Sequence, residues 1–274
     1  MFEQVRRRNK LSVAIAMAEV TYHSVVRDVR KQHGNAILAL GVNMLQIFLF
    51  VAVFYVMFSL LGLRGPGGIR GDFIVYLLTG IFLYMTNVKA VGAVMGAAGP
   101  TSPLMKHAPM NTFVAIAAAA FGCLYTQFLS VLLILYGYHV LIQPVTIDDP
   151  AGTFMMFMLA WLSGVSIGLL LLALKPWFPT VASIISTVYK RANMIASGKM
   201  FVANSLPGFM LVMFDWNPLF HIIDQCRGFA FINYNPRYTN WEYALNVSLC
   251  FVVLGLMGEF YTRRHTSLSW WARR

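Results

Sequence analysis

The sequence predicts an all-α integral membrane protein with six transmembrane helices. An amphipathic helix precedes the first of them, and a re-entrant helical hairpin at about residues 205–235 separates the fifth from the sixth. Of the 274 residues, 58% are hydrophobic and only 11% are charged. The mean hydropathy is +0.66, a balance that ordinary soluble domains do not show. The apolar residues also gather into runs of about 20, the length that a helix needs to cross a bilayer.

We expect a cytoplasmic N-terminus, a single transmembrane domain and a short cytoplasmic tail, at residues 1–35, 36–262 and 263–274. The six spans are placed from their apolar runs, to within a few residues at each end. They are Ala36–Leu63, Phe73–Val91, Thr112–Leu141, Thr153–Leu174, Thr180–Ala203 and Trp241–Thr262. Among these spans the fifth is unusual, because it carries three basic residues.

The distribution of basic residues places both termini on the cytoplasmic side. With that orientation, fourteen of the 21 lysines and arginines lie in cytoplasmic segments and four lie in external loops. This is a strong positive-inside bias. The cytoplasmic set includes Lys89, next to the end of the second span, and Lys175. The basic N-terminus lacks the short apolar core and small-residue cleavage site of a signal peptide.

The segment before the first span has the pattern of an amphipathic helix. Its apolar residues between Leu11 and Val29 recur at alternating spacings of four and three residues. A helix with this pattern beside a span is expected to lie in the plane of the membrane interface. A short soluble coiled coil is the alternative.

The connection between the second and third spans, at about residues 96–111, reads GAAGPTSPLMKHAPMN. Its prolines and glycines end any continuing helix. A short helix fits between Pro103 and Pro109 and would contain Leu104, Met105 and Lys106. A cytoplasmic connection of this kind is either a plain loop or an element that docks a partner.

Two apolar pieces between the fifth and sixth spans are too short to cross a bilayer. The second piece begins at Asn217, a suitable N-cap, with Pro218 at the first helical position. His221 and Asp224 then fall on the same helix face as Asn217, and Arg227 follows one turn later. Backbone that enters and leaves the same side of a membrane must pack on protein or line water. The pieces therefore form either a re-entrant hairpin or a helix lying flat on the outer surface.

The sequence lacks the common motifs of enzymes and metal sites. Its three cysteines lie far apart and show no zinc-ligand spacing. The segment ASGKM is not a phosphate loop, since it lacks the earlier glycine and the Ser or Thr after the lysine. An ion-driven transporter needs acidic residues within its spans, and none lies well inside a predicted span. We expect no catalytic residue, no metal site and no cofactor bound by this chain.

The basic residues of the fifth span indicate a water-filled path through the membrane. Lys190 falls about 15 Å along the span, near the bilayer midplane. Exposure to lipid there costs roughly 2.5 to 3.5 kcal/mol per charge, which a water-filled path would largely remove. The residues expected to line it are Tyr189, Lys190, Arg191 and Lys199. Two alternatives stay open: a span shifted to begin at Ala192, which leaves the first two cations in a cytoplasmic flank, and snorkelling of Lys199 to the outer interface.

The order of these elements resembles the membrane subunits of ABC exporters for capsular polysaccharide and O-antigen, over nearly the whole chain. The most specific motif is WNPLFHIIDQCRG, matched at Asn217, Pro218, Leu219, His221, Asp224 and Arg227. The segment KPWFP is similar to the family's short break between the fourth and fifth spans, and PLMKHAP to its coupling segment. The first span departs from the family, because GNAILALGVNML lacks the usual Trp and Pro near the lateral entrance.

The resemblance implies a permease subunit in a bacterial inner membrane, not an enzyme. It implies a homodimer with two copies of a separate ABC ATPase subunit that binds ATP and Mg²⁺. The cargo would be a lipid-linked capsular polysaccharide, and further envelope proteins would continue its path; no nucleic acid is expected as a partner. The cations of the fifth span predict that this polysaccharide is acidic.

The resemblance also assigns roles to three segments. The Pro103–Pro109 segment would dock on the ATPase, and the hairpin with Asn217 and Arg227 would form a periplasmic gate. The amphipathic helix would touch membrane lipids and flank a lateral gate through Glu19, Tyr22, Arg27 and Arg30. Other cargoes stay open, namely O-antigen, a teichoic-acid-like polymer, a lipid or a drug, as does a membrane-embedded enzyme or a channel without an ATPase.

Overall fold

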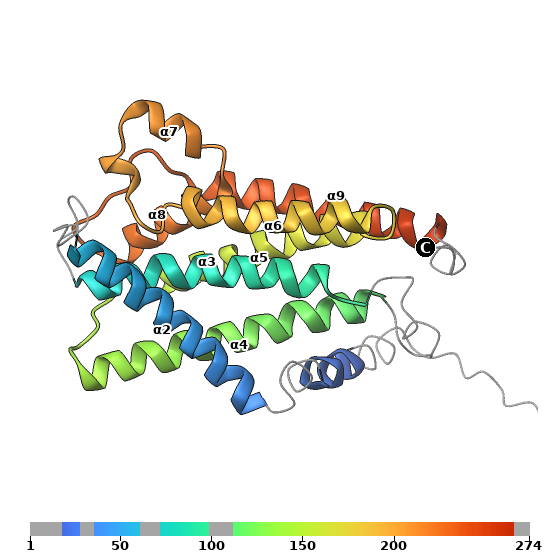
Figure 1. Cartoon of the computed structure of the whole chain (residues 1–274), viewed down its shortest axis with the longest axis horizontal. Coiled ribbons are helices and arrows are strands. Elements are labelled where there is room, and N and C mark those ends of the chain that lie inside the picture. Colours follow the sequence, from blue (N-terminus) through green and yellow to red (C-terminus); the bar gives the residue numbers. More distant parts are fainter. Residues whose placement is uncertain (1–17, 28–35, 61–71, 99–111, 266–274) are drawn as a thin grey trace, which may run out of the picture.

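The computed structural model describes residues 18–27, 36–60, 72–98 and 112–265. Every regular element in these ranges is helical (Figure 1). Five of the helices are long and apolar enough to cross a membrane. They are α2 (Ala36–Leu60), α3 (Phe73–Met95), α4 (Thr112–Leu141), α5 (Pro150–Leu174) and α9 (Trp241–His265). The described part of the chain is thus built as an all-α, multi-pass membrane protein, as the composition predicts.

Most observed helix ends lie close to the predicted ones, and local sequence explains the earlier start of α5. Helix α5 begins at Pro150 because the side chain of Asp149 accepts hydrogen bonds from the next two free backbone N–H groups, both at 3.0 Å. Helix α3 is capped in the same way by Asp72. At its other end α3 continues to Met95, four residues beyond the predicted end at Val91.

A further helix, α6 (Pro179–Ala196), packs against α5 and α3. The KPWFP segment forms the turn between α5 and α6, as predicted, and Pro179 occupies the first turn of α6. Helix α6 ends at Ala196, well before the predicted Ala203. The reason is Gly198, whose φ of +73° lies in the left-handed region that favours glycine. The alternative helix beginning at Ala192 is therefore wrong.

The hairpin that follows consists of η2 (Ala203–Ser205), α7 (Gly208–Phe214) and α8 (Pro218–Ala230). The side chain of Asn217 caps α8 by accepting from Leu219 N at 3.2 Å, which confirms the predicted helix start. Helix α7 has no buried residue and stands away from the bundle in Figure 1. Helix α8, in contrast, packs against α3, α5 and α9.

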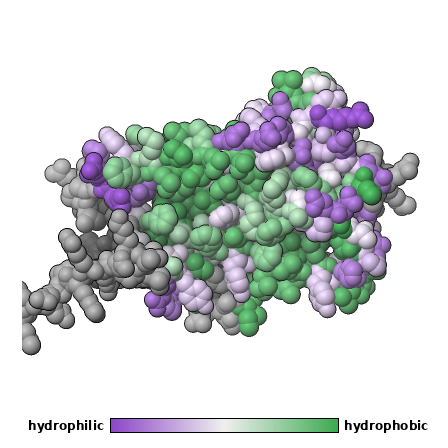
Figure 2. Space-filling model, turned by 180° about the vertical axis from the view of Figure 1, so that it is seen from behind, coloured by the Kyte–Doolittle hydropathy of each residue, from purple (hydrophilic) through white to green (hydrophobic). Residues whose placement is uncertain are grey.

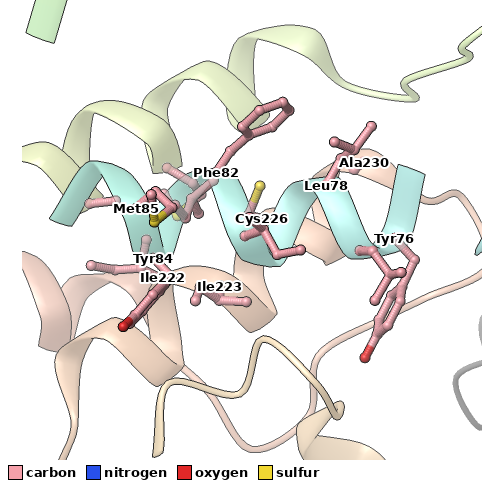
Figure 3. Packing of buried hydrophobic residues seen from close by; sticks show 14 of the residues in the cluster. Tyr76, Leu78, Phe82, Tyr84, Met85, Ile222, Ile223, Cys226 and Ala230 are labelled. Atoms are coloured by element: carbon pink, nitrogen blue, oxygen red, sulfur yellow. The ribbon is translucent and has the colours of Figure 1, made fainter. Parts of the chain in front are cut away.

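Helix α3 lies at the centre of the bundle and packs against α2, α4, α5, α6 and α8. The largest hydrophobic cluster forms where α3 meets α8 (Figure 3). It includes Tyr76, Phe82 and Met85 from α3 and Ile223 and Cys226 from α8. This contact fixes the position of α8, and with it the turn that connects α6 to the hairpin.

The outer faces of α2, α6 and α9 expose many large apolar side chains. On the face seen in Figure 2, apolar residues fill a broad stretch between hydrophilic residues that gather toward the two ends. Lipid hydrocarbon or a partner helix would cover such a surface.

The structure bears on only part of the predicted interface helix. Residues 18–27 are helical, and Glu19, Tyr22 and Arg27 are exposed on that helix. Arg30 lies outside the described residues, and so does the whole predicted coupling segment, Pro103–Pro109. Their roles stay predictions.

Candidate functional site

The three basic residues predicted to line one path lie in three different surroundings. Lys190 is half-buried, whereas its neighbour Arg191 is exposed. Lys199 follows the end of α6 and is only 1% exposed. Successive residues on a helix are about 100° apart, so Lys190 and Arg191 necessarily face different neighbours.

Lys190 lines a cavity of about 460 Å³ between α2, α3, α4 and α6. A second lysine, Lys89 of α3, lines the same cavity, which we call the dilysine cavity. None of its described lining residues is acidic; the polar ones besides the lysines are Asn43, Gln46, Cys123, Thr126 and Gln127. The cavity thus combines two cations with amide and hydroxyl groups.

A buried hydrogen-bond network forms one wall of the dilysine cavity. The Oδ1 atom of Asn43 accepts from Lys89 Nζ and from Gln127 Nε2, the latter at 3.0 Å. Asn43 Nδ2 in turn donates to Ser130 Oγ at 2.6 Å. The network joins α2, α3 and α4 and orients Lys89. Since an ammonium group has three donors and Asn43 is the described acceptor for Lys89, this lysine can bind a further acceptor.

Lys190 of α6 reaches the turn of α3 that follows Lys89. Lys190 Nζ lies 3.4 Å from the position that a β-carbon at Gly92 would occupy. Gly92 follows Lys89 by three residues and therefore shares its helix face. Among the described residues, the contact within 4.0 Å between a basic and an acidic side chain is that of His221 with Asp215. Neither lysine is neutralised by a described carboxylate.

Lys199 is enclosed by aromatic rings rather than by water or lipid. Its Nζ lies 3.8 Å from the ring centroid of Tyr84, 5.0 Å from that of Phe54 and 5.3 Å from that of Phe50. Aromatic faces attract cations at such distances. The ammonium group has no hydrogen-bond partner among the described residues. Lys199 does not snorkel; its side chain packs against α2 and α3 and so connects the turn after α6 to these two helices.

Tyr189 holds α6 to the centre of the bundle. Its hydroxyl donates to Asn87 Oδ1 at 3.0 Å, and Asn87 donates onward to Ser163 Oγ at 2.8 Å. Next to it, Tyr84 donates to the backbone oxygen of Lys190 at 3.2 Å. These bonds link α6 to α3 and α5 and fix the direction in which Lys190 points.

In the hairpin, Arg227 is completely buried and binds the turn that follows α6. Its Nη1 donates to Gly198 O at 2.8 Å and to Phe201 O at 2.6 Å, and its Nη2 donates to Lys199 O at 2.7 Å. The guanidinium group also lies 4.1 Å from the ring centroid of Tyr76. A cation–π contact and three charge-assisted hydrogen bonds therefore hold this turn.

Asp224 binds the segments on either side of the hairpin. Its carboxylate accepts from Ala203 N at 3.1 Å, from the Tyr234 hydroxyl at 2.5 Å and from the Thr239 hydroxyl at 2.9 Å. Burial, followed by the nearby Asp224 charge, raises the pKa of Tyr234. Tyr234 therefore stays a donor across the physiological pH range.

The remaining polar residues of the motif have comparable roles. His221 Nδ1 accepts from Asn240 N at 3.0 Å, and Nε2 lies 2.6 Å from Asp215 O. A neutral imidazole with its proton on Nε2 satisfies both contacts. Asn217 donates to Asn193 Oδ1 at 2.9 Å and so ties α8 to α6. The polar residues of the predicted motif, Asn217, His221, Asp224 and Arg227, thus lie together and hold the hairpin against the bundle.

The sequence did not single out the partners of Lys89. Lys89 was expected in a cytoplasmic segment; α3 continues six residues past it, which puts it about 9 Å inside the helix end, and its side of the membrane stays a prediction. Asn43 and Gln127 are 3% and 2% exposed and were not identified as site residues. The available signal was the presence of polar residues within otherwise apolar spans, which are costly in lipid and often functional.

Glu259 of α9 is a buried acidic residue near the end of its helix. It is 8% exposed and lies six residues before His265, where α9 ends. Its Oε1 atom has no hydrogen-bond partner among the described residues. It is not among the residues that line the dilysine cavity.

Comparison with known proteins gives no family for this chain, since no family model and no curated protein sequence matches it. No group of three or more His, Cys, Asp or Glu side chains in the described ranges is placed to hold a metal ion. The functional interpretation therefore rests on the residues of the chain itself.

Proposed function

We propose that this chain is the membrane subunit of an ATP-driven ABC exporter that moves a lipid-linked, acidic polysaccharide across a bacterial inner membrane. It would act as a homodimer with two copies of a separate ATPase subunit. The observation that carries the proposal is the pair of cations at the centre of α6, one directed into a cavity and the other exposed. An acidic polymer would be attracted by such cations, with Arg191 able to bind a carboxylate or phosphate through two hydrogen bonds.

In this proposal α6 also crosses the membrane, as the fifth of six spans in chain order. Its 18 residues give a length of about 27 Å, close to the hydrocarbon thickness of a bilayer. Its buried residues, Ala182, Ser186 and Asn193, lie along one face. The opposite face is exposed in the single chain, and a second copy packed beside it would enclose a path between the two subunits.

The arrangement of the helix ends supports the proposed orientation. The turn between α5 and α6 lies at the same end of the bundle as the C-terminal end of α9, where Trp177 donates to Thr262 at 3.0 Å (Figure 1). Lys175, Arg263 and Arg264 gather at this end, which would be cytoplasmic by the positive-inside rule. The hairpin would then lie on the periplasmic side and serve as a gate.

Co-purification tests the proposal. The full chain would be expressed with an ABC ATPase subunit encoded beside it, and ATP hydrolysis by the purified complex would be measured. In a matched variant, a Gly/Ser segment of equal length replaces Pro103–Pro109. We expect a complex whose assembly and ATP hydrolysis are lost in the variant. A chain that purifies alone in both forms would instead favour a channel or a membrane-embedded enzyme.

A further inference from the structure

We infer that the dilysine cavity binds the phosphate group of a lipid. The inference deepens the proposed function, on which its role in transport rests, by naming the group of the lipid anchor that the bundle recognises. Binding by this chain can nevertheless be measured without any ATPase, and this separates the two proposals experimentally.

The charge of the cavity favours an anion. Lys89 and Lys190 both line it, and no described lining residue is acidic. Two cations held inside an apolar bundle are costly unless an anion or water compensates them. A bound anion between the two lysines would remove their mutual repulsion and supply the missing acceptors.

The donors of the cavity suit a phosphate group in particular. Asn43 uses its Oδ1 to hold Lys89 and Gln127, and the ammonium group of Lys89 keeps further donors for a ligand in the cavity. Gln46 adds a side chain that can donate from α2, whereas the Thr126 hydroxyl already donates to Gly122 O at 3.0 Å. The oxygens of a phosphate can accept from several directions at once, which matches donors arriving from three helices.

The place of the cavity in the fold indicates that the phosphate belongs to a lipid. Val42 of α2 lines the cavity and is also 47% exposed on the apolar outer face of the bundle. A ligand could thus place its charged group between the lysines while its acyl or prenyl chain stays in the surrounding hydrocarbon. A volume of about 460 Å³ lies within the usual range of ligand sites and leaves room for the group attached to the phosphate.

The test uses the purified full chain in a neutral detergent. Native mass spectrometry would measure the binding of short-chain phosphatidylglycerol, with diacylglycerol as the matching lipid without phosphate and inorganic phosphate as the soluble source. We expect phosphatidylglycerol to bind at least tenfold more tightly than either of them. Equal binding of inorganic phosphate would overturn the lipid assignment, and equal binding of diacylglycerol would overturn the inference as a whole.

Variants then place the binding in the cavity. Lys89→Gln and Lys190→Gln should each weaken binding about tenfold or more, whereas Arg263→Gln, which removes one charge at the end of α9, should leave it unchanged. Gly92→Leu keeps both lysines but fills the space beside Lys190 Nζ, and it should weaken binding to a similar extent. Wild-type binding by Gly92→Leu and by either folded glutamine variant would refute the site.

The failure of each proposal has its own signature. Lipid binding that depends on the two lysines, in a chain with no ATPase partner, would leave the cavity assigned and reject the exporter. If the chain forms a complex with an ATPase but the glutamine variants bind lipid normally, the exporter would be supported and the cavity assignment rejected. Melting temperatures of all variants would identify any that has lost its fold.

Discussion

Replacement of Arg227 by alanine tests the structural account of the hairpin. The substitution removes three hydrogen bonds, of 2.6 to 2.8 Å, from a buried guanidinium group to backbone oxygens of the turn after α6. It also removes the contact with the ring of Tyr76. The carbonyl groups of Lys199 and Phe201 would then lose their described donor inside the bundle, whereas Gly198 O keeps a bond from Phe201 N at 3.3 Å; the loss is unfavourable even after local rearrangement.

The expected loss in the free energy of unfolding follows from the number of hydrogen bonds removed. Hydrogen bonds to charged groups contribute about 1.5 to 3 kcal/mol each, so three of them set a gross upper range of about 4.5 to 9 kcal/mol. Part of this is offset because the variant no longer buries a charge, and breaking a buried charged network typically costs 3 to 5 kcal/mol. We therefore expect Arg227→Ala to lower the free energy of unfolding by about 4 kcal/mol, roughly 10 °C in Tm for a chain of this length.

Thermal unfolding of the purified chain in detergent, followed by circular dichroism, measures the effect. The Tm of Arg227→Lys should lie about halfway between those of the wild-type chain and Arg227→Ala, because a point-like ammonium group cannot bind all three carbonyl oxygens at once. The control is Arg237→Ala, at an exposed arginine whose backbone N–H bond to Asn204 the variant keeps. A Tm for Arg227→Ala within 2 °C of the control would refute the reasoning.

Three further substitutions probe other contacts. Gly198→Ala should cost about 2 to 4 kcal/mol, since it combines a left-handed φ of +73° with a β-carbon only 2.7 Å from the ring of Phe220; an unchanged Tm would contradict this. Lys199→Met should leave Tm unchanged or raise it, because a thioether fits an aromatic cage without the cost of a buried charge; a marked fall would show that the cation itself stabilises the turn. Tyr189→Phe removes the hydrogen bond to Asn87 and should cost about 1 kcal/mol, measured by the same melting experiment; a loss above 3 kcal/mol would mean that α6 depends on this bond far more than its single contact implies.

The helices could be predicted because their signals are local. Long apolar runs located the five spans, and the asparagine and proline at the start of α8 located its first residue. The end of α6 was missed, since the prediction weighted apolar character over the glycine at position 198. The end of α3 was missed because Lys89 reads as a flanking charge, although the helix continues to Met95.

The cavity and the aromatic cage could not be predicted, because both depend on which helices are neighbours. Asn43, Lys89 and Gln127 are far apart in the sequence and meet only when α2, α3 and α4 pack together. The rings around Lys199 likewise come from α2 and α3. The periodicity of one helix shows which residues share a face but not what that face meets.

The most direct test of the central claim is the export of acidic polysaccharide to the cell surface. Cells lacking this chain would receive either the wild-type chain or the Lys190→Gln/Arg191→Gln double variant, with membrane levels of both proteins checked by immunoblot. We predict that the wild-type chain restores surface polysaccharide and that the double variant restores less than about a tenth of it at an equal membrane level. Full export by the double variant would contradict a role for the cations of α6, and unchanged surface polysaccharide in cells without the chain would contradict the exporter itself.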